Sequence, residues 1–184
     1  LILMFIIFSA LSIGSSPDRG FSFYNYYNLM GRYILIYYLV VNNIQSTDQV
    51  KRIVWAILGS AFIVALYGFY QYLFSDRMIT EWVDYEQFPD LKFRVFSTMQ
   101  NPNLLAGFLV TIMAIAAGLG CKETTLSCRS AAFSLVAILA VCLVLTYSRG
   151  AWLSVLALIA AFGVLYNRKI FWLLLLLPLL GLFG

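Results

Sequence analysis

The sequence contains no histidine among its 184 residues. Without an imidazole the chain cannot form a Ser-His or Cys-His nucleophile pair. A structural zinc site takes about four nitrogen or sulfur ligands, and three cysteines without histidine fall short of that number. We therefore interpret Cys121, Cys128 and Cys142 as structural thiols and expect no metal site or cofactor. The chain lacks a basic tract, so no nucleic-acid partner is expected. It also lacks a glycine-rich phosphate loop.

Charged residues are scarce as well, at 11% of the chain, whereas 62% of the residues are hydrophobic. Soluble domains carry about 25% charged residues, so this composition predicts an integral membrane protein whose helices bury apolar surface in lipid. Both ends of the chain lie in apolar runs, residues 1–14 and 170–184, and the first residue is Leu1. We expect the sequence to be a piece of a longer membrane protein.

The predicted fold is all-α, a polytopic transmembrane helical bundle with about five complete spans and partial helices at both ends. A span takes about 20 apolar residues. Residues 1–184 would form part of a single transmembrane domain, with a long external loop at residues 75–101. The apolar runs predict helices at residues 1–14, 21–41, 53–74, 102–120, 130–147, 151–166 and 170–184.

The charges of the connecting segments indicate the orientation. Residues 42–52, 121–129 and 167–169 would lie on one side of the membrane and carry six basic residues against two acidic ones. Segments expected on the opposite side carry five basic and six acidic residues. Because cytoplasmic loops are enriched in Lys and Arg, the first side is predicted to be cytoplasmic, which places residues 75–101 outside.

A single charged residue, Arg149, interrupts the apolar stretch of residues 130–166. One helix of that length would measure about 55 Å, far more than a bilayer core of about 30 Å, so the chain must reverse. Ser148, Arg149 and Gly150 are the predicted hinge, on the outer side. Arg149 would either cap the preceding helix and extend to the headgroups, or hold a phosphate through its planar fork of donors.

A second polar cluster begins the helix predicted at residues 102–120. Asn101 suits an N-cap and Pro102 the first helical position. The outward-facing N-terminus would offer free N–H groups and the positive end of the helix dipole to an anion. Asn103 adds an amide side chain, and Arg94 lies a few residues upstream.

Two further features leave alternatives open. Arg32, within the helix predicted at residues 21–41, would line the same outer cavity, extend to the tyrosine cluster at residues 24–27, or pair with a loop carboxylate such as Asp18. Asp84 and Glu86 in the long loop could hold a divalent metal through oxygen ligands, although a solvated loop is the favoured interpretation.

The segment RVFSTMQNPNLLAGFLV at residues 94–110, followed by LTYSRGAWLSVLALI, resembles the O-antigen ligase and O-antigen polymerase family of bacterial envelope proteins. In that family an Arg precedes an Asn-Pro-Asn that opens a transmembrane helix, and a Ser-Arg-Gly closes a later one on the outer side. The resemblance covers residues 94–166; the earlier helices agree only in character. It implies a multi-pass protein of the bacterial cytoplasmic membrane.

The implied activity is metal-independent glycosyl transfer from undecaprenyl diphosphate to an acceptor glycan or glycolipid. By this resemblance Arg94 and Arg149 would be the catalytic residues that neutralise the diphosphate leaving group. Asn101 and Asn103 would orient either the helix end or the lipid phosphate. Arg32 and Ser148 complete the expected substrate-binding set.

The family's ligases also carry a histidine, proposed as general base, on a later external loop. This chain has no histidine, so it is expected to be catalytically incomplete. The same family includes bicarbonate transporters, and the alternative functions are therefore an anion transporter or a non-catalytic membrane subunit.

Overall fold

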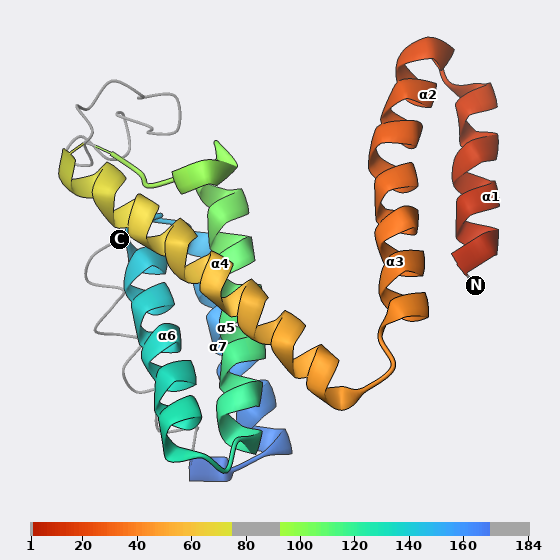
Figure 1. Cartoon of the computed structure of the whole chain (residues 1–184). Helices are drawn as coiled ribbons and strands as arrows, with labels where there is room; N and C mark the ends of the chain where they lie inside the picture. The colour runs from red at the N-terminus through yellow and green to blue at the C-terminus, as the bar shows by residue number, and fades with distance from the viewer. Residues whose placement is uncertain (1, 75–92, 170–184) are drawn as a thin grey trace. The chain divides into compact units, whose positions relative to one another are not determined.

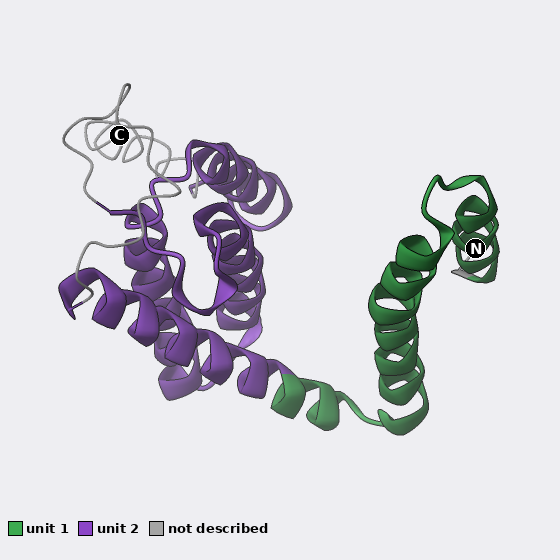
Figure 2. Cartoon of the chain, turned by 90° about the horizontal axis from the view of Figure 1, so that it is seen from above, with its two compact units in different colours: residues 1–53 green, residues 54–184 purple. Residues whose placement is uncertain are grey.

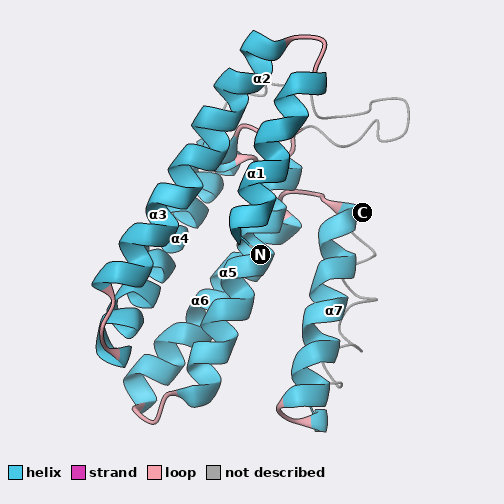
Figure 3. Ribbon diagram, turned by 90° about the vertical axis from the view of Figure 1, so that its right-hand side faces the viewer, coloured by secondary structure: helices cyan, strands magenta, loops and turns pink. Residues whose placement is uncertain are grey.

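The computed structural model describes residues 2–74 and 93–169, and within these ranges every regular element is a helix (Figure 3). This confirms the all-helical fold class. The chain divides into two compact units, Leu1–Ile53 and Val54–Gly184, which are described separately below (Figure 2). The helix predicted at residues 170–184 lies outside the described residues, as do residues 75–92 of the long loop.

Unit 1 contains a helical hairpin. Its elements are α1 (Ile2–Ser12), a 3₁₀ turn (Ile13–Ser15), α2 (Arg19–Tyr26), a π-helical segment (Tyr27–Gly31) and α3 (Arg32–Asn43). Asp18 caps α2, because its side chain accepts a hydrogen bond of 2.9 Å from the backbone N–H of Phe21.

The helix predicted at residues 21–41 is present but not uniform. Tyr26 and Arg32, at the two joints, have right-handed helical backbone angles, so α2 and α3 continue through the π-helical segment. A π-helical segment inserts an extra residue into a turn and shifts the side chains that follow it around the helix axis. Arg32 directly follows this segment.

Helix α4 (Thr47–Phe74) begins earlier than the predicted start at residue 53. Ser46 and Gln49 form a reciprocal capping box, in which the N–H of Gln49 donates to Ser46 Oγ at 3.3 Å. The N–H of Ser46 donates in return to Gln49 Oε1 at 3.2 Å. These two polar residues therefore allow the helix to start outside the apolar run.

Three helices follow residues 93–101, and each runs antiparallel to the one before it: α5 (Pro102–Lys122), α6 (Leu126–Val144) and α7 (Arg149–Leu165). Figure 1 shows the start of α5, the end of α6 and the start of α7 at one end of these helices. Asn101 caps α5 as predicted, with Pro102 in the first turn. Helix α6 begins four residues before and ends three residues before its predicted bounds of 130–147.

Helix α5 supplies the centre of the unit 2 core. Its buried residues pack with side chains from α4, α6 and α7, and the loop residue Val95 joins the same cluster. Small residues bring backbones close: a Cβ at Gly120 would lie 3.0 Å from Phe133 Cε2 and 3.3 Å from Ala132 Cβ. The core comprises Leu58, Ala61, Ala65, Val95, Leu105, Ala106, Leu109, Ile112, Met113, Ala116, Leu135, Leu139, Cys142, Leu143, Ala151 and Val155.

Within the described ranges, three helices are long and apolar enough to cross a membrane: α4, α5 and α6. The predicted count of about five complete spans is not confirmed. The π-helical segment divides the helix of unit 1 into shorter α-helical parts, and α7 has 17 residues. Since a span takes about 20 residues, α7 alone is slightly short of one.

Candidate functional site: a two-arginine cluster at the start of α5

Residues 93–97 lie between α4 and the turn that joins α6 to α7. The backbone N–H of Val95 donates to the carbonyl oxygen of Leu145 at 3.0 Å, and the Val95 side chain is fully buried. Because the adjacent Val95 is bonded to the α6–α7 turn, the position of Arg94 is set by long-range contacts.

Arg94 connects this segment to two other elements. Its Nε donates to the carbonyl oxygen of Thr146 at 2.9 Å, and its Nη2 donates to Asn103 Oδ1 at 3.0 Å. The Arg94 side chain is half-buried. Two hydrogen bonds from different guanidinium nitrogens fix the orientation of the planar group.

Asn103 is the common acceptor of the cluster. The Ser148 hydroxyl donates to the same Asn103 Oδ1 at 3.0 Å. The backbone N–H of Asn103 donates to the side chain of Asn101 at 2.8 Å, which is the N-cap interaction of α5. Four of the six predicted site residues, Arg94, Asn101, Asn103 and Ser148, are thus joined in one hydrogen-bonded network.

The turn between α6 and α7 corrects the predicted hinge. The chain reverses at residues 145–147, with N–H donation from Thr146 to the Leu143 carbonyl and from Tyr147 to the Val144 carbonyl. Tyr147 takes the left-handed conformation, with φ of 50°. Gly150, predicted to permit the reversal, is helical, and no described glycine has a positive φ.

Arg149 is the first residue of α7, and Ser148 is its N-cap. A helix N-terminus carries partial positive charge, so a cation there is not favoured by the dipole. The Ser148 side chain donates to Asn103, and its own N–H donates to Thr146 Oγ1 at 3.3 Å. The start of α7 is consequently bound to the start of α5.

The two arginines are close enough to influence one another. Burial lowers the pKa of Arg94, and the positive charge of Arg149 lowers that pKa further. An arginine nevertheless remains protonated, because its usual pKa lies far above physiological pH. Two guanidinium groups and the N-termini of two helices therefore concentrate positive charge at this end of unit 2, and this charge favours an anion.

The cluster offers no carboxylate or imidazole base in the described part of unit 2. The one acidic residue there, Glu123, follows the opposite end of α5. Burial raises the pKa of Tyr147, and the nearby Tyr72 raises it further, so the phenol is neutral at physiological pH. The described groups of the cluster therefore offer hydrogen-bond donors and positive charge suited to an anion, and none of them is a strong base at neutral pH.

Arg32 belongs to unit 1 and begins α3. Its Nη2 donates to Asn28 Oδ1 at 3.0 Å, one helical turn earlier, and Asp18 is engaged in capping α2. Its predicted share in the outer cavity stays a prediction. The alternative metal ligands, Asp84 and Glu86, lie outside the described residues. In residues 2–74 and 93–169, no three His, Cys, Asp or Glu side chains gather as a metal site would require.

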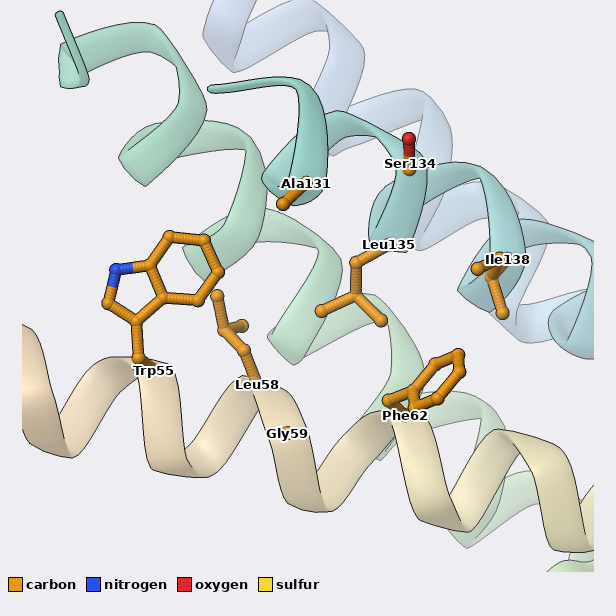
Figure 4. A pocket seen from close by; sticks show the side chains of 8 residues that line it. All are labelled: Trp55, Leu58, Gly59, Phe62, Ala131, Ser134, Leu135 and Ile138. Carbon is orange, nitrogen blue, oxygen red and sulfur yellow. The ribbon is translucent and has the colours of Figure 1, made fainter. Parts of the chain in front are cut away.

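A separate groove of about 250 Å³ lies between α4 and α6. Figure 4 shows Leu58 of α4 and Leu135 of α6 directed toward one another, with Trp55 and Phe62 on either side along α4. The indole N–H of Trp55 and the Ser134 hydroxyl are the polar side-chain groups among the lining residues. Without a charged residue, this groove suits hydrocarbon and not an anion.

Sequence reasoning missed Gln71, Thr146 and Tyr147. Of the three, Gln71 has the clearest signal in the sequence, because a polar side chain within an apolar helix indicates a hydrogen-bonding role. Thr146 contributes a backbone carbonyl and Tyr147 a backbone conformation, and neither has a distinctive residue pattern.

Comparison with known proteins leaves the family open. No protein-family model, curated protein or solved structure matches this chain.

Proposed function

We propose that this chain is an O-antigen ligase/polymerase-like membrane protein that transfers a glycan from undecaprenyl diphosphate to an acceptor sugar. The observation that carries the proposal is the network in which Arg94 and Ser148 both donate to Asn103, with Arg149 directly after Ser148. This network supports binding of a diphosphate at the start of α5.

The proposed reaction is a substitution at the anomeric carbon of the donor glycan. An acceptor hydroxyl forms the new C–O bond, its proton leaves to a base, and the bond to the diphosphate breaks with its electron pair. Negative charge grows on the departing diphosphate. Arg94 and Arg149 would stabilise that charge, and removal of one such donor typically lowers kcat by about 100-fold to 1,000-fold.

The other residues of the network act on geometry. Asn101 holds the first turn of α5, and Asn103 aligns Arg94 with Ser148. Tyr147 is protonated and cannot serve as the base. The base would therefore come from outside the described residues.

Anion transport is the alternative for the same cationic cluster. A transport route needs polar groups that continue along the helices. The hydroxyl of Thr111 donates to the Gly107 carbonyl at 2.9 Å, and that of Ser154 to the Gly150 carbonyl at 3.3 Å. In α5 to α7, Ser134 adds a third hydroxyl away from the helix ends, and three scattered hydroxyls do not form a continuous route. The described helices therefore favour the transferase over the transporter.

A null mutant of the full-length protein tests the proposal. We expect loss of a surface polysaccharide and accumulation of its lipid-linked precursor, measured by glycan analysis and by extraction of polyprenyl-linked sugars. A mutant with normal envelope glycans but impaired uptake of an inorganic anion would contradict the transferase and support the transporter.

A further inference from the structure

Helix α4 holds the backbone that carries Arg94. The side chain of Gln71 is 6% exposed, and its Oε1 accepts two hydrogen bonds from the adjacent segment. The donors are the N–H groups of Phe96 at 3.1 Å and Ser97 at 2.9 Å, two and three residues after Arg94. This irregular segment has no neighbouring strand or helical turn to accept from these two N–H groups. The Gln71 side-chain oxygen accepts from both of them instead.

A second attachment lies about two turns earlier on α4. The Ser97 hydroxyl donates to the Val64 carbonyl at 2.7 Å. Between Val64 and Gln71, Gly68 leaves room for the segment, because a Cβ there would lie 3.2 Å from Val95 Cγ1 and 3.0 Å from Cys142 Sγ. Val64, Gly68 and Gln71 therefore form a seat on α4, and we call it the α4 seat.

The backbone on this seat is strained. Ser97 has a φ of 50°, a value that non-glycine residues adopt infrequently. Such conformations persist where the surroundings determine them. Gln71 holds Ser97 in this conformation from the side of α4. On the other side, the carbonyl oxygens of Leu145 and Thr146 accept hydrogen bonds from Val95 and Arg94.

We propose that Gln71 is a positioning residue for Arg94. It contacts no ligand itself and carries no charge. It sets the affinity of the two-arginine cluster for a diphosphate by fixing the backbone of residues 95–97. This inference rests on the proposed function, because it concerns the same anion site.

Titration of the whole chain in detergent micelles with inorganic pyrophosphate, followed by calorimetry, tests the inference. Arg94→Ala should weaken binding at least tenfold, since it removes a charged donor. Gln71→Met has a similar volume but no acceptor, and it should weaken binding by about tenfold, because small displacements of a binding group are costly.

Gln49 provides a matched control. Its Oε1 also accepts two backbone hydrogen bonds, from Gln45 at 2.7 Å and Ser46 at 3.2 Å, at the other end of α4. Gln49→Met should leave pyrophosphate affinity unchanged. In a double variant, Gln71→Met should add little to the effect of Arg94→Ala, because Gln71 acts through Arg94.

The outcomes separate the two claims. If Arg94→Ala weakens binding and Gln71→Met does not, the positioning role is wrong and the proposed function stands. If the wild-type chain binds no pyrophosphate, or Arg94→Ala binds it equally well, both are overturned. Should Gln71→Met fail to fold, Ser97→Ala removes the attachment to Val64 and should weaken binding about threefold; unchanged affinity in that variant refutes the role.

Discussion

At the residue scale, Asn103 makes three of the hydrogen bonds that hold the two-arginine cluster together. It is exposed, yet its side-chain oxygen accepts from both Arg94 and Ser148, and its N–H completes the cap of α5. The three connections come from three segments of unit 2. A change at this one amide therefore alters both the alignment of the cations and the local stability.

Asn103→Asp should separate these two effects. A carboxylate keeps the acceptor and strengthens the bond to Arg94, since charge-assisted hydrogen bonds are about twice as strong as neutral ones. The same negative charge would oppose an incoming anion. We expect unchanged or higher thermal stability but at least tenfold weaker pyrophosphate binding, measured by thermal unfolding and by calorimetry.

Asn103→Ala gives the complementary result. It removes the acceptor of two hydrogen bonds and should lower the free energy of unfolding by about 1–2 kcal/mol. If Asn103→Asp bound pyrophosphate as tightly as the wild-type chain, the anion site at this position would be refuted.

Arg149→Lys tests the planar fork against simple charge. Lysine retains the positive charge but cannot donate two parallel hydrogen bonds, so the proposed glycan transfer should fall roughly tenfold to a hundredfold. The side chain is exposed, and protein level should be unchanged. The exposed Arg129, in the first turn of α6, is a matched control, and Arg129→Lys should leave transfer unaffected.

At the scale of elements, the antiparallel pair α5 and α6 depends on small residues where the helices join. Gly120 lies near the end of α5, and its Cα faces Ala132 and Phe133 near the start of α6. The close approach sets the direction in which α6 returns. It thereby helps to bring the α6–α7 turn back to the start of α5, where the two-arginine cluster forms.

Gly120→Ala should destabilise the chain. Its Cβ would lie 3.0 Å and 3.2 Å from two ring carbons of Phe133, so the ring must shift. Overpacking of this kind lowers the free energy of unfolding by about 1–3 kcal/mol. Thermal unfolding in detergent, followed by circular dichroism, measures the effect.

Gly107→Ala is the control for helix propensity. The added Cβ meets no heavy atom within 4 Å, so the substitution should be neutral or stabilise by up to about 1 kcal/mol. Equal loss of stability in the two variants would contradict the steric explanation.

At the scale of the whole molecule, the three apolar helices α4, α5 and α6 indicate a membrane protein. Within unit 2, the two-arginine cluster and the α5–α6 connection lie at opposite ends of α5. The charges of the connecting segments predict that the cluster faces outward, which is where a lipid-linked glycan would be available after crossing the membrane.

Thiol labelling in intact cells measures this orientation. Cys121 and Cys128 are half-buried and flank the α5–α6 connection, whereas Cys142 is buried. A membrane-impermeant reagent should modify the first two only after permeabilisation. In a background without the native cysteines, Thr98→Cys, at an exposed position near the cluster, should be labelled directly. Strong labelling of Cys128 in intact cells would reverse the predicted orientation.

The sequence by itself determined the features that depend on local interactions and on overall composition. The apolar runs predicted membrane helices, and Asn101 with Pro102 predicted the start of α5 to the residue. The motif at the start of α5 and the hinge before α7 also predicted Arg94, Asn103 and Ser148 as site residues; the structure joins them by hydrogen bonds, and their role stays a prediction.

Only the tertiary structure decided how these residues meet. The bond from Arg94 to Thr146 joins positions 52 residues apart, and that from Gln71 to Ser97 joins positions 26 apart. Such pairs depend on how helices pack, and nothing in local sequence specifies it. The left-handed conformation of Tyr147 has the same origin, because tyrosine has no intrinsic preference for it and the surrounding helices impose the turn.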